Sequence, residues 1–115
     1  MRINLKSILL IICFLVLTVP VRANSLKAQE AELDKIYQAL SEELSTPGKT
    51  KLDQAKEAWL TFRQEQCAFN AAGSMGGSVY PAILSLCYEE LTQQYTALLK
   101  AQLNCQEGDL SCGGQ

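Results

Sequence analysis

The segment from Trp59 to Cys87 constrains the fold of this chain more than any other feature. Its first part, WLTFRQEQC over residues 59–67, has the three- and four-residue spacing of a helix, and a second helical pattern begins before Cys87. Between them lies the sequence GSMGGS, residues 73–78, which cannot continue a helix at low cost. The segment therefore predicts two helices that are joined by a loop and linked by a disulfide across its base.

The N-terminal residues are typical of a secretory signal peptide. Arg2 and Lys6 form a short basic region, residues 7–19 form an apolar run, and Val21-Arg22-Ala23 offers a small-residue cleavage site. The run of thirteen residues is shorter than the ~20 that a membrane-spanning helix needs. We therefore expect residues 1–23 to be cleaved, with an uncleaved anchor as the alternative. The mature protein would then be periplasmic or secreted, without stable membrane insertion.

Four cysteines remain once Cys13 is removed with the signal peptide. An even number in a secreted chain is typical of disulfides in an oxidising compartment. Cys87 and Cys105 lie eighteen residues apart on one helical pattern, or about 27 Å, whereas a disulfide needs Cα atoms about 4.4–6.8 Å apart. A helical hairpin places Cys67 beside Cys87, so we predict the pairs Cys67–Cys87 and Cys105–Cys112.

The charge of the mature chain restricts its partners and its chemistry. Without the three basic residues of the signal peptide, seven basic residues face twelve acidic ones, a net charge of −5. This balance argues against nucleic acid as a partner and favours a basic protein. The sequence contains no histidine, the commonest general base and a usual zinc ligand. We therefore expect no catalytic residues, no metal site and no cofactor.

Hydrophobic spacing predicts three helices and no strands. We expect the helices at about residues 26–44, 49–70 and 81–103. The predicted fold class is all-α, a small three-helix bundle with a disulfide-stapled antiparallel helical hairpin. Residues 24–104 would form the helical domain, and residues 105–115 a short tail closed by its own disulfide.

The apolar face of the second helix is predicted to be buried. Residues at three- and four-residue steps along this face are Leu52, Ala55, Trp59, Phe62, Gln66 and Phe69. This is the spacing of an antiparallel helix pair, so we expect the aromatic side chains in the core. Arg63 lies at the edge of the face. An arginine there either braces the Gly-rich loop or contacts a partner.

These motifs together resemble the bacterial LprI-like lysozyme inhibitor family. The chain has, in the family's order, the helix Leu33–Leu40, the motif Trp59–Cys67, the loop Gly76-Gly77-Ser78 and the motif Cys87–Thr92. The resemblance spans about residues 31–99, although Tyr95 stands where family members often have arginine. It implies a helical domain that inhibits a lysozyme-type muramidase.

The predicted function is that of a secreted or periplasmic inhibitor that binds a basic lysozyme-type enzyme. The nine residues 71–79 exceed what a helical hairpin needs, and a disulfide at their base would pre-organise the loop. The candidate binding residues are Arg63, Ser74, Met75, Gly76, Gly77 and Ser78. The alternative is a cell-envelope structural or adaptor domain that binds another envelope protein or a glycan without inhibiting an enzyme. The sequence leaves the oligomeric state open.

Overall fold

A computed structural model describes residues 26–106 and 108–113, which form three α-helices and no β-strand. The elements are α2 (Leu26–Glu43), α3 (Thr46–Ala71), the 3-10 turn η1 (Ala72–Ser74) and α4 (Tyr80–Leu103). The predicted all-α bundle is confirmed. The predicted signal peptide, residues 1–23, lies outside the described residues. None of the described helices is long and apolar enough to span a membrane.

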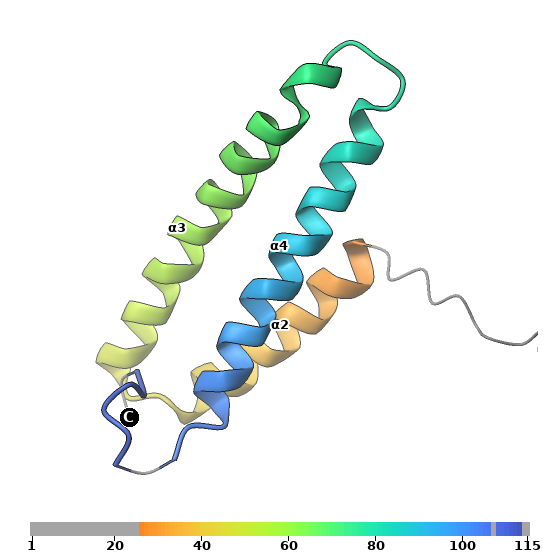
Figure 1. The fold of residues 1–115 in the computed structure, drawn as a ribbon. Coiled ribbons are helices and arrows are strands. Elements are labelled where there is room, and N and C mark those ends of the chain that lie inside the picture. The colour runs from red at the N-terminus through yellow and green to blue at the C-terminus, as the bar shows by residue number, and fades with distance from the viewer. Residues whose placement is uncertain (1–25, 107, 114–115) are drawn as a thin grey trace, which may run out of the picture.

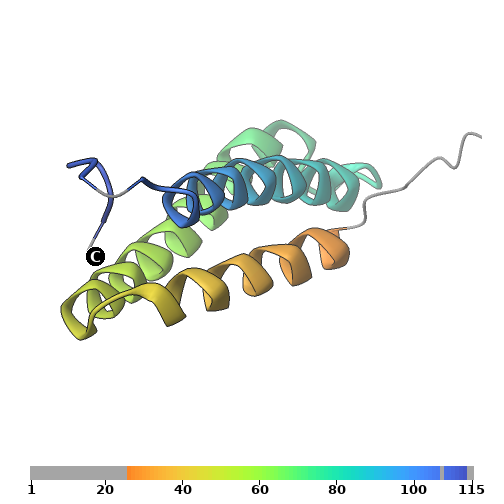
Figure 2. The same cartoon turned by 90° about the horizontal axis from the view of Figure 1, so that it is seen from below.

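α3 and α4 form an antiparallel hairpin, and α2 packs along one face of it, chiefly against α4 (Figure 1). Viewed from below, α2 and α3 meet at their connection and diverge toward the other end of the hairpin (Figure 2). The core lies where all three helices are close together. Its buried members are Leu33, Ile36, Leu40, Leu44, Leu52, Tyr95 and Leu99. The hydrophobic stripe of α2 therefore supplies much of the core, as its helical spacing predicts.

The connection between α2 and α3 is tighter than predicted. Only Leu44 and Ser45 separate the helices, because α3 begins at Thr46 rather than near residue 49. The Ser45 hydroxyl accepts a hydrogen bond from the Gly48 amide at 3.3 Å, which caps the first turn of α3. Pro47 lies in that turn, where a backbone N–H would have no hydrogen-bond partner within the helix, so the N–H that proline lacks is not needed.

Polar contacts hold α2 against α3. Lys56 Nζ lies 3.1 Å from Asp34 Oδ1 and 4.0 Å from the centre of the Tyr37 ring. The Tyr37 hydroxyl donates to Asp53, a bond that raises the pKa of this tyrosine to about 12. The apolar stripe of α2 faces α4 rather than α3. The polar contacts of Tyr37, Asp53 and Lys56 therefore provide much of the attachment of α3 to α2.

Of the helices in residues 26–106, only two reach the far end of the hairpin. α2 has 18 residues, whereas α3 has 26, so α3 is longer by about 12 Å. The hairpin tip therefore extends past the N-terminal end of α2 (Figure 1). Phe62 and Phe69 are 52% and 77% exposed, so the prediction that they lie in the core is wrong. Trp59 does pack against the core.

Both predicted disulfide pairs are confirmed. The Cα atoms of Cys67 and Cys87 lie 5.6 Å apart, and those of Cys105 and Cys112 lie 5.8 Å apart. Cys67 is fully buried four residues before the end of α3, and its disulfide joins α3 to α4 near the tip. The first disulfide therefore takes the place of a third helix near the tip.

Removal of the two disulfides should have unequal effects on stability. The double substitution Cys67→Ala, Cys87→Ala should lower the free energy of unfolding by about 3 kcal/mol, because it frees a long loop in the unfolded chain. The matched pair Cys105→Ala, Cys112→Ala should lower it by about 1 kcal/mol less, because this disulfide closes a shorter, mostly exposed loop outside the core. Urea denaturation followed by circular dichroism measures both. Equal losses would contradict the assigned role of Cys67–Cys87.

Candidate functional site

The loop at the hairpin tip is ordered by its own hydrogen bonds. The Ser74 hydroxyl donates to the Ala71 carbonyl at 2.8 Å, and the Gly77 amide donates to the Ser74 carbonyl at 2.9 Å. Gly76 has φ +82°, a conformation that other residues rarely adopt. At Gly77 a Cβ atom would lie 3.1 Å from the Ser74 carbonyl oxygen. Gly76 is therefore required by the turn, a side chain at Gly77 would be tight against Ser74, and a Cβ at Gly73 would meet open space.

The tip presents an uncharged surface. Residues 66–88 contain no Lys, Arg, Asp or Glu, and Glu65 and Glu89 flank this neutral stretch. Met75 is 70% exposed and Val79 is 53% exposed, beside the exposed Ser78. The predicted binding residues 74–78 thus lie together in one turn, in which residues 75–78 are exposed and Ser74 is half-buried. This turn offers apolar side chains, a hydroxyl group and backbone, but no ionised group.

Arg63 lies apart from this loop. Its Nη1 donates to Glu30 Oε1 on α2 at 3.0 Å and to the Thr92 hydroxyl on α4 at 2.9 Å. Its guanidinium also lies 4.9 Å from the Trp59 ring centre and 5.1 Å from that of Tyr88. The prediction that Arg63 braces the Gly-rich loop is wrong: it connects all three helices, about 12 Å along α3 from the end of that helix.

The partners of Arg63 are buried or partly buried. Thr92 has no exposed surface, and the Thr96 hydroxyl donates to its carbonyl at 2.7 Å. The Arg63 side chain is 16% exposed, and that of Glu30 is 44% exposed. Sequence reasoning missed Glu30 and Thr92 as partners. A signal for Thr92 was available in the sequence, because this threonine belongs to the motif Cys87–Thr92 that resembles the family.

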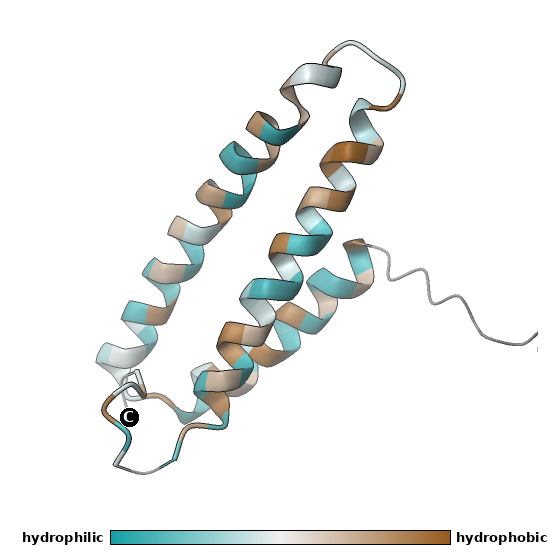
Figure 3. Ribbon diagram, viewed as in Figure 1, coloured by the Kyte–Doolittle hydropathy of each residue, from teal (hydrophilic) through white to brown (hydrophobic). Residues whose placement is uncertain are grey.

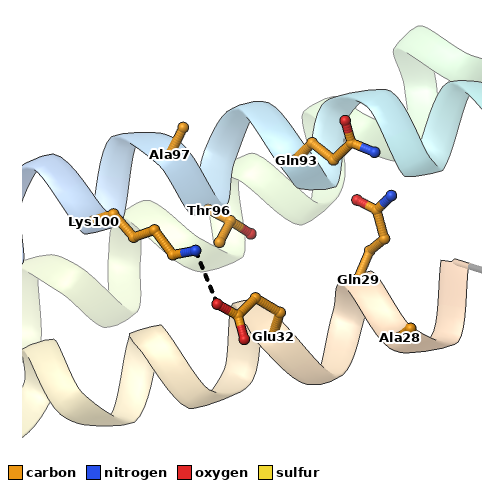
Figure 4. Close-up of a pocket in the computed structure, with 7 residues that line it drawn as sticks. All are labelled: Ala28, Gln29, Glu32, Gln93, Thr96, Ala97 and Lys100. Atoms are coloured by element: carbon orange, nitrogen blue, oxygen red, sulfur yellow. Dashed lines mark ion pairs between the residues drawn. The ribbon is translucent and has the colours of Figure 1, made fainter. Parts of the chain in front are cut away.

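A polar groove of about 550 Å³ lies between α2 and α4 (Figure 4). Its lining consists of Ala28, Gln29, Glu32, Gln93, Thr96, Ala97 and Lys100. Lys100 Nζ lies 2.9 Å from Glu32 Oε1, and this hydrogen-bonded ion pair lowers the pKa of Glu32. The Gln29 Nε2 is buried and has no hydrogen-bond partner among the described residues. The groove therefore combines charged, amide and hydroxyl groups with one unsatisfied donor.

Comparison with protein families identifies one family for this chain. The family model described as "Lysozyme inhibitor LprI" matches residues 21–99. An uncharacterized protein, R02472, of Rhizobium meliloti (strain 1021) is 33% identical over 94 residues, which cover 70% of this chain and 68% of that protein. No solved structure matches the chain significantly. The family match includes α2, α3, the tip loop and most of α4, and ends before Cys105.

Loss of the Arg63 charge should destabilise the fold. Arg63→Met keeps an apolar stem but removes both hydrogen bonds of Nη1, so the free energy of unfolding should fall by about 2 kcal/mol. Lys100→Met removes an exposed ion pair and is the matched control, with an expected loss below about 1 kcal/mol. Chemical denaturation monitored by circular dichroism compares the two. If Arg63→Met costs no more than Lys100→Met, Arg63 does not hold the three helices together.

Proposed function

This chain belongs to the family of LprI lysozyme inhibitors, and from this premise we propose that it is a secreted or periplasmic protein whose hairpin tip blocks the substrate cleft of a lysozyme-type muramidase. In this proposal the protein acts as an inhibitor rather than an enzyme. The observation that supports it most is the position of residues 75–78, which lie exposed at the end of a stapled hairpin that extends past α2.

The shape of the tip is suited to entry into a cleft. Past the N-terminal end of α2 the described part of the molecule is two helices wide, so the tip can advance without a collision between α2 and the enzyme (Figure 1). The disulfide and the hydrogen bonds within the loop hold its conformation before binding. Less conformational entropy is then lost when the complex forms, which favours affinity.

The charge distribution is also complementary to such an enzyme. Glycosidases of this type place two carboxyl groups in the cleft, so an acidic loop would be repelled there. Residues 66–88 carry no charged side chain, while the rest of the mature chain supplies the net charge of −5. The body of the protein would thus attract a basic enzyme, and the tip would enter without charge repulsion.

The groove between α2 and α4 supports a second candidate function. Its lining includes the exposed amide of Gln93, the exposed ammonium group of Lys100 and the residue Thr96. Amide and hydroxyl groups of this kind bind sugars and peptides through hydrogen bonds. A cell-envelope adaptor that binds a glycan or another envelope protein would use this groove and would leave the muramidase unaffected.

Inhibition is tested by mixing residues 24–115 with a basic lysozyme and recording lysis of cell-wall substrate. We expect stoichiometric protein to slow lysis at low ionic strength, with the effect falling steeply as salt is added, because the attraction between opposite net charges is screened. Unchanged lysis at low salt would exclude inhibition of this enzyme class. Binding of cell-wall glycan that Gln93→Leu abolishes would then favour the adaptor function.

The role of the tip is tested by charge substitution within the loop. Met75→Asp places a carboxylate on an exposed side chain and should weaken inhibition at least tenfold, because it faces the carboxylates of the cleft. Leu110→Asp adds the same charge at a fully exposed position in the tail and is the matched control. It should change inhibition less than twofold. Equal inhibition by both variants would show that the tip does not enter the cleft.

A further inference from the structure

One broad face of the hairpin lies opposite α2, and no helix of residues 26–106 covers it (Figure 1, Figure 2). On α3, the side chains of Lys56 and Arg63 reach α2. Phe62 and Phe69 lie about 100–140° around the helix from these two residues, and they are 52% and 77% exposed. Both phenylalanines therefore point away from α2 into solvent.

α4 contributes to the same face. Thr96 and Lys100 line the polar groove against α2, and Leu98 lies about 160° around the helix from both of them. Leu98 is 64% exposed. In the view that has α2 behind α4, hydrophobic segments recur along α4 (Figure 3). We call this surface the open face, and apolar side chains gathered on one exposed face mark a site for another protein.

An apolar groove of about 460 Å³ opens onto the open face at the base of the hairpin, the end opposite the tip. Its lining includes Lys51 and Ala55, which are exposed and lie in the same row of α3 as Phe62 and Phe69, at three- and four-residue steps. A groove of this size admits small molecules and so has room for an aromatic side chain. Most of the remaining lining is apolar and comes from Leu40, Leu44, Pro47, Leu52 and Leu99.

From this arrangement we propose that the open face binds a second copy of this chain, with Phe69 of each copy in the apolar groove of the other. A two-fold interface brings one surface against itself, so that surface must carry both a projecting side chain and its receptor. Phe62 lies midway between Ala55 and Phe69, seven residues from each. A two-fold axis at Phe62, with the two α3 helices antiparallel, therefore places each Phe69 at the Ala55 of the other copy.

The size and charge of the open face suit such a dimer. Residues 51–69 of α3 span about 28 Å and two packed helices are about 20 Å wide, so the copies would pair over roughly 560 Å² each. The total of about 1,100 Å² exceeds the ~1,000 Å² expected of a specific interface. Between its ends at Lys51 and Phe69, the row on α3 carries no charge, and its members are Ala55, Ala58, Phe62 and Gln66.

α4 carries a polar pair with the same symmetry. Thr92 is hydrogen-bonded to Arg63, so it lies at the level of the proposed axis. Glu90 and Gln94 are exposed two residues before and after Thr92, and Gln94 Nε2 donates to Glu90 Oε1 at 3.2 Å within one copy. The axis would bring the Glu90 carboxylate of each copy beside the Gln94 amide of the other. The carboxylate would then meet a hydrogen-bond donor rather than another carboxylate.

Self-association is measured by sedimentation equilibrium of residues 24–115, without any enzyme, so the result does not depend on muramidase inhibition. We expect a reversible monomer–dimer equilibrium that added salt strengthens, because each copy has a net charge of −5 and ions screen the repulsion. Monomers at every concentration up to millimolar would overturn the proposal and leave the open face to a different protein. Growth beyond dimers would also overturn it, because a two-fold interface closes.

Substitution of the projecting side chain tests its role. Phe69→Gln should weaken the dimer about tenfold or more, because each dimer loses two buried phenyl rings. Leu60→Gln is the matched control, since Leu60 is 41% exposed but lies beside Glu30 and Arg63 on the side of α2. It should change the dissociation constant less than about twofold. Circular dichroism checks that both variants fold. A Phe69→Gln dimer as tight as the unaltered one would contradict the proposal.

Mixing two variants tests the reciprocal contact. Ala55→Glu blocks the groove at an exposed position, so neither this variant nor Phe69→Gln retains a contact between Phe69 and an open groove in its own dimer. A mixed dimer retains one of the two, from the Phe69 of the Ala55→Glu copy to the open groove of the other. Sedimentation velocity with one variant labelled should therefore show mixed dimers several-fold tighter than either variant alone. Mixed dimers no tighter than these would refute the pairing of Phe69 with the groove.

Discussion

The Arg63 guanidinium is the contact on which the arrangement of the three helices depends. A cation with little solvent exposure must be paired, because an unpaired one would cost several kcal/mol. Its partners here belong to the other two helices, Glu30 on α2 and Thr92 on α4. Arg63 therefore marks a boundary in the molecule. On one side the three helices share a hydrophobic core, and on the other the hairpin continues as two helices joined by a disulfide.

This boundary separates two kinds of surface. The tip is neutral, ordered by its own hydrogen bonds and positioned by Cys67–Cys87. The body holds most of the charge of the mature chain and both grooves described above, one polar and one apolar. A ligand bound to either groove lies far from residues 74–78 along the hairpin. Recognition at the tip and binding at the body are therefore physically independent in this fold.

The helices and disulfides could be predicted from the sequence because both depend on local geometry. Helical spacing gives the length of α4, and that length alone prevents Cys87 from reaching Cys105. Exposure of Phe62 and Phe69 could not be predicted in the same way. Spacing shows which residues share a face of a helix, but not which other helices lie against that face. The prediction for Arg63 was wrong for a related reason, since its partners Glu30 and Thr92 lie 33 and 29 residues away in the chain.

The separation of the tip from the core has a consequence for the evolution of such proteins. Substitutions at Met75, Ser78 or Val79 alter exposed side chains, and they remove no contact with the buried cluster. Surface changes of this kind usually affect folding free energy by less than about 0.5 kcal/mol. Only Gly76 and Gly77 are restricted, by the backbone of the turn itself. The tip can therefore diversify while the scaffold stays constant, which is the property needed to follow a changing target.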